Sequence, residues 1–237
     1  MKKALLLLVF IFTLSIFNIR AQENYVTSSG EFIFSLADVR NTAISEQQNT
    51  NLRFTAFFHW NVNWHIDFNN NVGIYTGGAI RNVGLIRKVN DSLKIKERVY
   101  TFGIPLAFKL GDFDKNLYFF AGGEVEFPFN FKQKTFIDNK KEDKENWWLS
   151  DRTDWYMPSV FAGITFPGGL SVKAKYYINN FYNQDFKTNG NMPYQNLEAN
   201  IFYISLSTML KFSDVSFEND NGNSNQMQNK QAGYWKD

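Results

Sequence analysis

The 237-residue chain contains no cysteine and no apolar run long enough for a membrane-spanning helix, because the run from Ala4 to Phe17 is too short and nothing comparable follows it. A spanning helix needs about 20 consecutive apolar residues. Without cysteine the chain can form no disulfide, and it cannot be anchored through a lipidated cysteine. Any attachment to a membrane must therefore come from another kind of structure.

The chain also has almost no excess of charge of either sign. Its 25 Lys and Arg are nearly balanced by 23 Asp and Glu, which gives a formal net charge of +2. Lys2 and Lys3 precede an apolar run from Ala4 to Phe17, and Ala21, just after Arg20, then offers a small residue before Gln22. This arrangement predicts a secretory signal peptide over residues 1–21, cut before Gln22. Loss of those three cations turns the charge of +2 into −1, which argues against nucleic acid as a partner.

What the sequence has in abundance is alternation between apolar and polar residues. Residues 52–68 alternate throughout, and 202–212 do so again up to a final aromatic. A period of two predicts strands with one oily face, and the second run is about as long as a tilted strand needs to cross a bilayer. Because it resembles the last strand of an outer-membrane barrel, we expect Phe202, Leu210 and Phe212 to form the signal read by the barrel assembly machinery.

The alternating runs number about eight. They are residues 31–39, 52–68, 72–87, 97–110, 117–131, 156–166, 170–181 and 199–212. Short turns at 69–71, 111–116 and 167–169 alternate with longer polar stretches at 40–50, 88–94, 132–155 and 183–197. The predicted fold over 22–212 is therefore all-β: an eight-stranded antiparallel barrel in the cell outer membrane, with short periplasmic turns and longer extracellular loops. Residues 213–237 are polar and predict a disordered periplasmic tail.

A soluble barrel with an apolar interior would show the same alternation, and side-chain volume decides between the two. The interior of an eight-stranded barrel is only just wide enough to be filled by side chains. The apolar faces carry Phe, Trp, Leu, Ile or Tyr at most positions. These bulky residues must point outward into lipid, and the smaller or charged residues must fill the lumen.

Three short motifs accompany this layout: Glu-Phe-Pro-Phe at 126–129, Pro-Gly-Gly at 167–169 and Lys-Tyr-Tyr-Ile at 175–178. With the Ala-Gln signal site, the chain resembles the small outer-membrane barrels of Bacteroidota grouped as PorT-like, over nearly its whole mature length. The resemblance implies a β-barrel in the outer membrane and a link to protein secretion. It implies no catalytic residues and no cofactor.

The inward faces predict a charge network that closes the lumen. If the turn at 111–116 pairs Leu110 with Leu117, Glu124 faces Gly103 and, beyond it, Arg81. A register centred on Pro-Gly-Gly places Lys173 opposite Gly163, and we expect Gly163 to face Glu124 as well. The two glycines would then leave room for Arg81 and Lys173 to reach Glu124. Glu126 and Lys175 lie one layer away.

His59 and His65 are the only histidines, and alternation places both on the lumen face. Six residues apart on a strand, they lie about 20 Å from each other, too far to share a metal. A lipid-modifying barrel enzyme needs a histidine and a serine that face the lipid. We therefore expect no metal site and no catalytic residue.

Residues 132–155 combine a run of six charged residues with tryptophans. The charges predict a solvated loop. Tryptophans at a membrane interface form a girdle, and the candidates are Trp60, Trp64, Trp147, Trp148 and Trp155. Partner binding by this loop is a third interpretation.

The leading functional hypothesis is a non-enzymatic barrel with a structural or accessory role, in secretion or envelope assembly. It would contact outer-membrane lipid and engage a protein partner through its extracellular loops or C-terminal tail. A narrow passive solute channel is the first alternative, and a lipid-modifying enzyme is the second. Paired charges inside the lumen would favour the first hypothesis over the channel.

Overall fold

The computed structural model describes residues 23–214, and the predicted signal peptide and nearly all of the predicted tail lie outside them. All regular structure in this part is β. The strands are β1 (Glu23–Asn41), β2 (Glu46–Gln48), β3 (Arg53–Thr55), β4 (Trp60–Asp67), β5 (Val72–Lys88), β6 (Leu93–Asp112), β7 (Leu117–Ile137), β8 (Lys140–Trp148), β9 (Met157–Thr165), β10 (Leu170–Tyr177) and β11 (Leu197–Asp214). No helix within residues 23–214 is long and apolar enough to cross a membrane.

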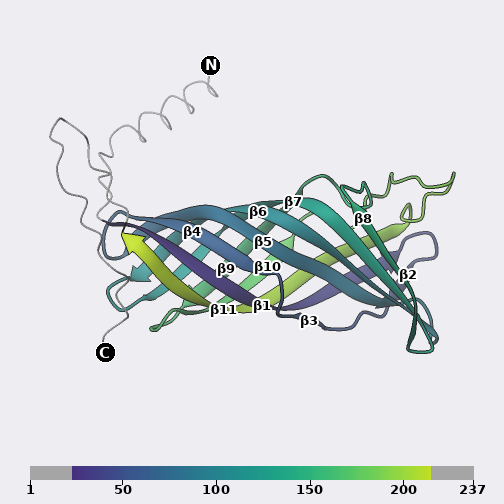
Figure 1. The fold of residues 1–237 in the computed structure, drawn as a ribbon, viewed down its shortest axis with the longest axis horizontal. Helices are drawn as coiled ribbons and strands as arrows, with labels where there is room; N and C mark the ends of the chain where they lie inside the picture. The colour runs from purple at the N-terminus through teal and green to yellow at the C-terminus, as the bar shows by residue number, and fades with distance from the viewer. Residues whose placement is uncertain (1–22, 215–237) are drawn as a thin grey trace, which may run out of the picture.

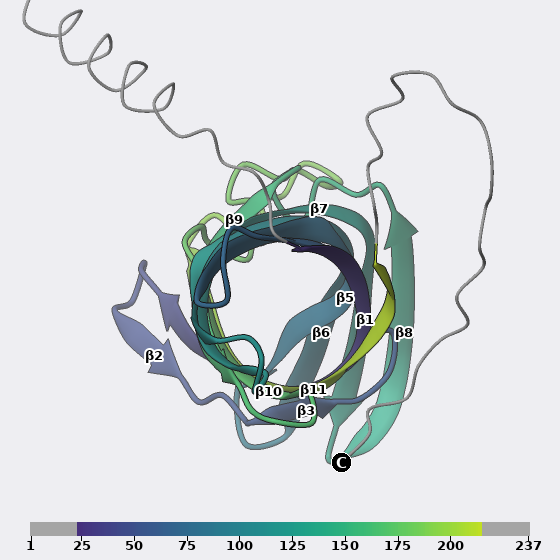
Figure 2. The ribbon, with the colours of Figure 1, turned by 90° about the vertical axis from the view of Figure 1, so that its left-hand side faces the viewer.

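Eight of these strands close into an antiparallel ring in the order β1, β4, β5, β6, β7, β9, β10 and β11. The ring closes between its first and last strands, with a register that runs from Tyr25–Asp214 to Asn41–Leu197. A closed ring leaves no unpaired edge, which is the condition for a sheet to cross a bilayer. Figure 2 shows the ring along its axis, with β2 and β8 outside it. The predicted fold class is confirmed.

The two ends of the barrel differ (Figure 1). At one, here called the turn end, residues 68–71, 113–116 and 166–169 make short connections, and β1 begins and β11 ends there. At the other, here called the loop end, lie the connections 42–59, 138–156 and 178–196, with β2, β3 and β8 among them. Strands β6 and β7, 20 and 21 residues long, extend well beyond what a bilayer crossing requires.

The outer surface carries an apolar belt that follows the ring. Its large exposed residues include Phe32, Val62, Ile80, Phe102, Ile104, Leu106, Phe108, Phe119, Val160, Ile204 and Leu206. The buried inward positions are rich in polar and charged residues. This is the reverse of a soluble barrel and is the pattern of a barrel surrounded by lipid.

The continuous strand predicted over 52–68 is wrong, because residues 56–59 separate β3 from β4. Both strands pair with β1, but Thr55 faces Ile33 whereas Trp60 faces Gly30. Two extra residues must therefore bulge out between them, and Phe58 takes a positive φ of 64° there. Alternation survives the bulge because an even number of residues is added.

The stretches 88–94 and 132–155 are not simple loops either. Strand β5 continues to Lys88 and strand β6 begins at Leu93, so only a tight turn joins them. Likewise β7 and β8 form a hairpin around Asp138 and Asn139, whose φ angles are 47° and 64°. Two residues with positive φ make a type I′ turn, which suits the twist of a hairpin. The charged run therefore lies on a strand.

Candidate functional site in the lumen

Six inward-pointing charged side chains meet in the middle of the barrel. They are Glu31 on β1, Arg81 on β5, Glu124 and Glu126 on β7, and Lys173 and Lys175 on β10. Five are at most 2 % exposed and Lys173 is 13 % exposed. Three cations balance three anions, so this lumen network is neutral.

Arg81 lies at the centre of the network. Its Nε is 3.1 Å from Glu31 Oε2, and its Nη1 pairs with Glu124 Oε1 and lies 3.3 Å from Glu126 Oε1. Its Nη2 donates to Asn61 Oδ1 at 2.5 Å. All three nitrogens of the guanidinium are therefore engaged, which a buried charge requires.

The two lysines complete the network from the opposite wall. Lys175 Nζ is 2.8 Å from Glu124 Oε2 and also pairs with Glu126 Oε1. Lys173 Nζ is 2.7 Å from Glu31 Oε1. The hydroxyls of Thr101 and Tyr177 donate to Glu126 at 2.5 and 2.8 Å. Each carboxylate thus has a partner on both oxygens.

The structure brings together all five residues that the sequence predicted for this network, but by a different register. Gly103 faces Glu126 and Ala79, and Glu124 faces Pro105, so both predicted pairs of Gly103 are wrong by two residues. The hairpin is longer than expected because Asp112 pairs with Leu117.

Gly103 nevertheless leaves room for Glu124, because a Cβ there would lie 2.1 Å from Glu124 Oε1. Gly163 does face Lys173, as predicted, but it does not face Glu124. Its opposite residue on β7 is Phe120, and a Cβ at Gly163 would lie 2.5 Å from the Phe120 ring. The space at Gly163 therefore serves an aromatic layer of the lumen.

Sequence reasoning missed Glu31. This residue lies on β1, one of the two strands whose pairing closes the ring, and it links that strand to the network. Besides Arg81 and Lys173 it accepts a hydrogen bond from Ser205 on β11. The signal was present, since alternation through Ser29, Ile33 and Ser35 places Glu31 on the inward face.

The lumen is also filled on the turn-end side of the network. Tyr75, Tyr118, Phe120 and Phe161 pack there as an aromatic layer. Lys109 then pairs with Asp67 at 2.5 Å and lies over the ring of Phe113. The cavities in this half measure about 40 and 60 Å³, room for a few water molecules and no solute.

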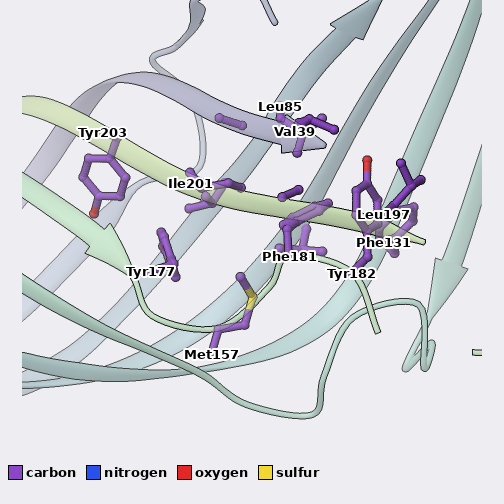
Figure 3. Close-up of a cluster of buried hydrophobic side chains, with 14 of the residues drawn as sticks. Val39, Leu85, Phe131, Met157, Tyr177, Phe181, Tyr182, Leu197, Ile201 and Tyr203 are labelled. Atoms are coloured by element: carbon purple, nitrogen blue, oxygen red, sulfur yellow. The ribbon is translucent and has the colours of Figure 1, made fainter. Parts of the chain in front are cut away.

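An apolar plug fills the loop-end half (Figure 3). The connection 178–196 folds inward and contributes Phe181, Tyr182 and Tyr194, which pack with Leu85, Val99, Phe131 and Ile201 from the wall. Tyr182 donates to Glu97, whose carboxylate lies 3.0 Å from Arg87 Nε. Burial, followed by the charge of Glu97, raises the pKa of Tyr182 well above its usual value. The sequence predicted a strand over 170–181 and a polar stretch over 183–197, but β10 ends at Tyr177 and residues 178–181 already belong to the connection.

Both histidines lie in the lumen wall, as alternation predicts. His59 contacts Thr55 Oγ1 at 3.1 Å and accepts from the Asn82 backbone, and His65 contacts Thr27 Oγ1 at 2.9 Å. Neither is exposed to lipid. Among residues 23–214 no group of metal-ligating side chains could hold an ion.

The predicted girdle divides. Trp60, Trp148 and Trp155 are exposed on the outside, and Trp64 is half-buried. Trp147 points inward, where it packs on Phe131 beneath the Arg152 guanidinium, so its place in a girdle is wrong. Neighbouring residues of a strand point to opposite sides, so Trp147 and Trp148 cannot share a face.

The three residues of the predicted assembly signal, Phe202, Leu210 and Phe212, all point outward from β11.

Comparison with known proteins gives matches among solved structures only. No protein-family model matches the chain, and no curated protein does. The attachment invasion locus protein Ail of Yersinia pestis, solved with the heparin analogue sucrose octasulfate, matches with a TM-score of 0.38 and 12% identity over 78% of this chain and 99% of that one.

OprG of Pseudomonas aeruginosa matches with a TM-score of 0.35 and 9% identity over 79% and 96% of the two chains. Neisserial surface protein A gives 0.33 and 8% over 78% and 96%. These scores are low, and the assignment rests on the closed ring, the outward apolar belt and the polar lumen. The chain is a small outer-membrane β-barrel protein.

Proposed function

We propose that this barrel does not conduct solutes and does not catalyse a reaction, and that it has a structural or accessory role in the outer membrane. The observation that carries the proposal is the closed lumen: the ion network, with an aromatic layer on one side of it and an apolar plug on the other. Every layer blocks the same axis. A solute would have to displace all three.

The enzyme alternative has no lipid-facing histidine among residues 23–214. A lipid-modifying barrel needs its nucleophile and base on the lipid-facing surface. His59 and His65 both point into the lumen and are held there by threonine hydroxyls. The outer face between them carries Trp60, Val62 and Trp64, which contribute no base.

In this accessory role, the surface that contacts a protein partner would lie at the loop end of the barrel. The hairpin of β7 and β8 extends past the apolar belt, with Ile137 exposed at its tip and Trp148 and Leu149 exposed at its base (Figure 1). Exposed apolar residues beyond the belt fit contact with a protein. By the usual topology of bacterial barrels, this end faces outside and the turn end faces the periplasm.

A role in secretion or envelope assembly is the finer form of the proposal, and it is supported by the PorT-like resemblance of the sequence motifs. Insertion would depend on the barrel assembly machinery, through the outward residues of β11. The C-terminal tail after residue 214 remains a second proposed contact for a partner.

Site-specific photo-crosslinking in intact cells tests the accessory role. A photoreactive residue replaces Ile137 at the hairpin tip, and the matched control replaces Lys115, which is exposed at the turn end. We expect a discrete protein adduct from position 137 that is absent from position 115. Identical adduct patterns from the two positions, or no adduct from 137, would remove the hairpin as the partner surface.

A further inference from the structure

Five cations lie side by side on the outer face of the sheet at the loop end. Arg98 faces Lys132 across β6 and β7, Lys96 faces Lys134, and Lys134 faces Lys144 on β8. We call these five residues the basic face. Since paired residues of neighbouring strands share a face, all five side chains point away from the barrel axis.

These charges are not neutralised within the protein. None of the five takes part in an ion pair anywhere in residues 23–214. Burial, and then the charges of Arg98 and Lys144, lower the pKa of Lys132. The pKa of Lys134 is lowered too, by burial and then by the charges of Arg98, Lys144, Lys141 and Lys96. Like charges directly opposite on a sheet are destabilising. A bound anion would remove that cost.

The aromatic residues of the same face hold the cations in place. Lys132 Nζ lies 4.8 Å from the centre of the Tyr100 ring, and the Arg98 guanidinium lies 5.5 Å from it. Lys96 Nζ lies 5.0 Å from the ring of Phe136. Such contacts fix a cation without consuming its charge. The basic face is therefore partly ordered before any ligand arrives.

The position of the basic face indicates what the ligand is. On β6 the outward residues run from Leu110 through Phe102, all apolar, then Tyr100, then Arg98. Arg98 lies four residues beyond Phe102, which is about 13 Å along the strand. The polar headgroup layer begins at the border of the apolar belt. In a bilayer that covers the belt, the basic face would lie beside the headgroups, because it is on the same outer surface as the belt.

We propose that the basic face binds the phosphate groups of a phosphorylated lipid in the surrounding leaflet, of the lipid A type. The acyl chains would lie along the apolar belt below Phe102, and the phosphates would lie between Arg98, Lys132 and Lys134. A soluble polyanion would bind charges directed into the solvent, whereas these charges point toward the lipid. The proposal does not depend on the closed lumen.

The test measures binding of fluorescent bisphosphorylated lipid A to the full chain in non-ionic detergent. The basic-face variant is Arg98→Gln with Lys132→Gln, and the control is Lys115→Gln with Lys187→Gln, which removes two exposed cations elsewhere. Each Lys or Arg near an anionic surface strengthens binding about fivefold. We expect the basic-face variant to bind about 25-fold more weakly and the control to bind within about twofold of the unaltered chain, as for surface charges away from the site.

Three further arms keep the proposal open to refutation. Lipid A stripped of its phosphates should bind the unaltered chain and the variant alike. A second pair, Lys96→Gln with Lys134→Gln, repeats the test if the first variant does not fold, as judged by the mobility of the unheated barrel on a gel. Equal affinity of variant and unaltered chain for phosphorylated lipid overturns the proposal. The third arm measures binding of inorganic polyphosphate instead of the lipid. A loss confined to polyphosphate also overturns the proposal, because it would assign the face to a soluble polyanion.

Discussion

Replacing Glu124 by glutamine removes one of three buried anions and leaves a net positive charge in the lumen network. Lys175 Nζ lies 2.8 Å from Glu124 Oε2, and Arg81 pairs with the other oxygen. At an effective dielectric constant of about 20, a pair of unit charges at 2.8 Å is worth about 6 kcal/mol. Because Lys175 and Arg81 keep Glu126, we expect a smaller net cost of about 3–5 kcal/mol, the usual value for breaking a buried pair.

The assay is reversible urea unfolding of the protein folded into lipid vesicles. Glu142→Gln is the matched control, since Glu142 is exposed on β8, and it should change the free energy of unfolding by less than about 0.5 kcal/mol. The double variant Arg81→Met with Glu124→Met restores neutrality, so its cost should fall below the sum of the single costs by about 1–3 kcal/mol. A cost for Glu124→Gln below about 1 kcal/mol, or strictly additive single costs, would refute the reasoning.

Three other outcomes follow from the same structure. Gly103→Ala should destabilise the barrel by about 1–3 kcal/mol in the same unfolding assay, because its Cβ would lie 2.1 Å from Glu124 Oε1, whereas a Cβ at Gly123 would make only an ordinary contact with Ser159 O at 3.6 Å, so Gly123→Ala should be neutral. Ending the chain before Tyr203 unpairs the turn-end half of β1 from β11 and should abolish insertion, while ending it after Asp214 should not; normal membrane yield of the shorter chain would contradict this. Protease added to intact cells should cut the chain within residues 138–156 and not at the turns, and cleavage confined to the turn end would reverse the proposed orientation.

The alternation of the sequence predicted the ring because one requirement acts on every strand. Lipid requires apolar residues on the outside, and a narrow lumen requires small or charged residues on the inside. The alternation therefore identifies each strand and the face on which each of its residues lies. The break at residues 56–59 was not predictable from alternation, because it arises from how β3 and β4 both pair with β1. Only the three-dimensional register contains that mismatch.

The lumen network shows why a site can be predicted from a partly wrong register. The pairing of β6 and β7 was misjudged by two residues, and a shift of two keeps every side chain on its face. Long side chains such as Arg81 and Lys175 then bridge the remaining offset. The apolar plug was not predicted, because Phe181, Tyr182 and Tyr194 lie in a connection rich in Asn and Gln. Their burial depends on contacts with strands far away in the chain.

Planar-bilayer recording of the unaltered protein tests the closed lumen most directly. Protease protection in the same preparation establishes that the barrel is inserted. We expect no steady conductance above that of the bare membrane, because the aromatic layer, the ion network and the apolar plug each fill the lumen. A steady conductance of the unaltered protein that Glu124→Gln leaves unchanged would contradict it and would identify the barrel as an open channel.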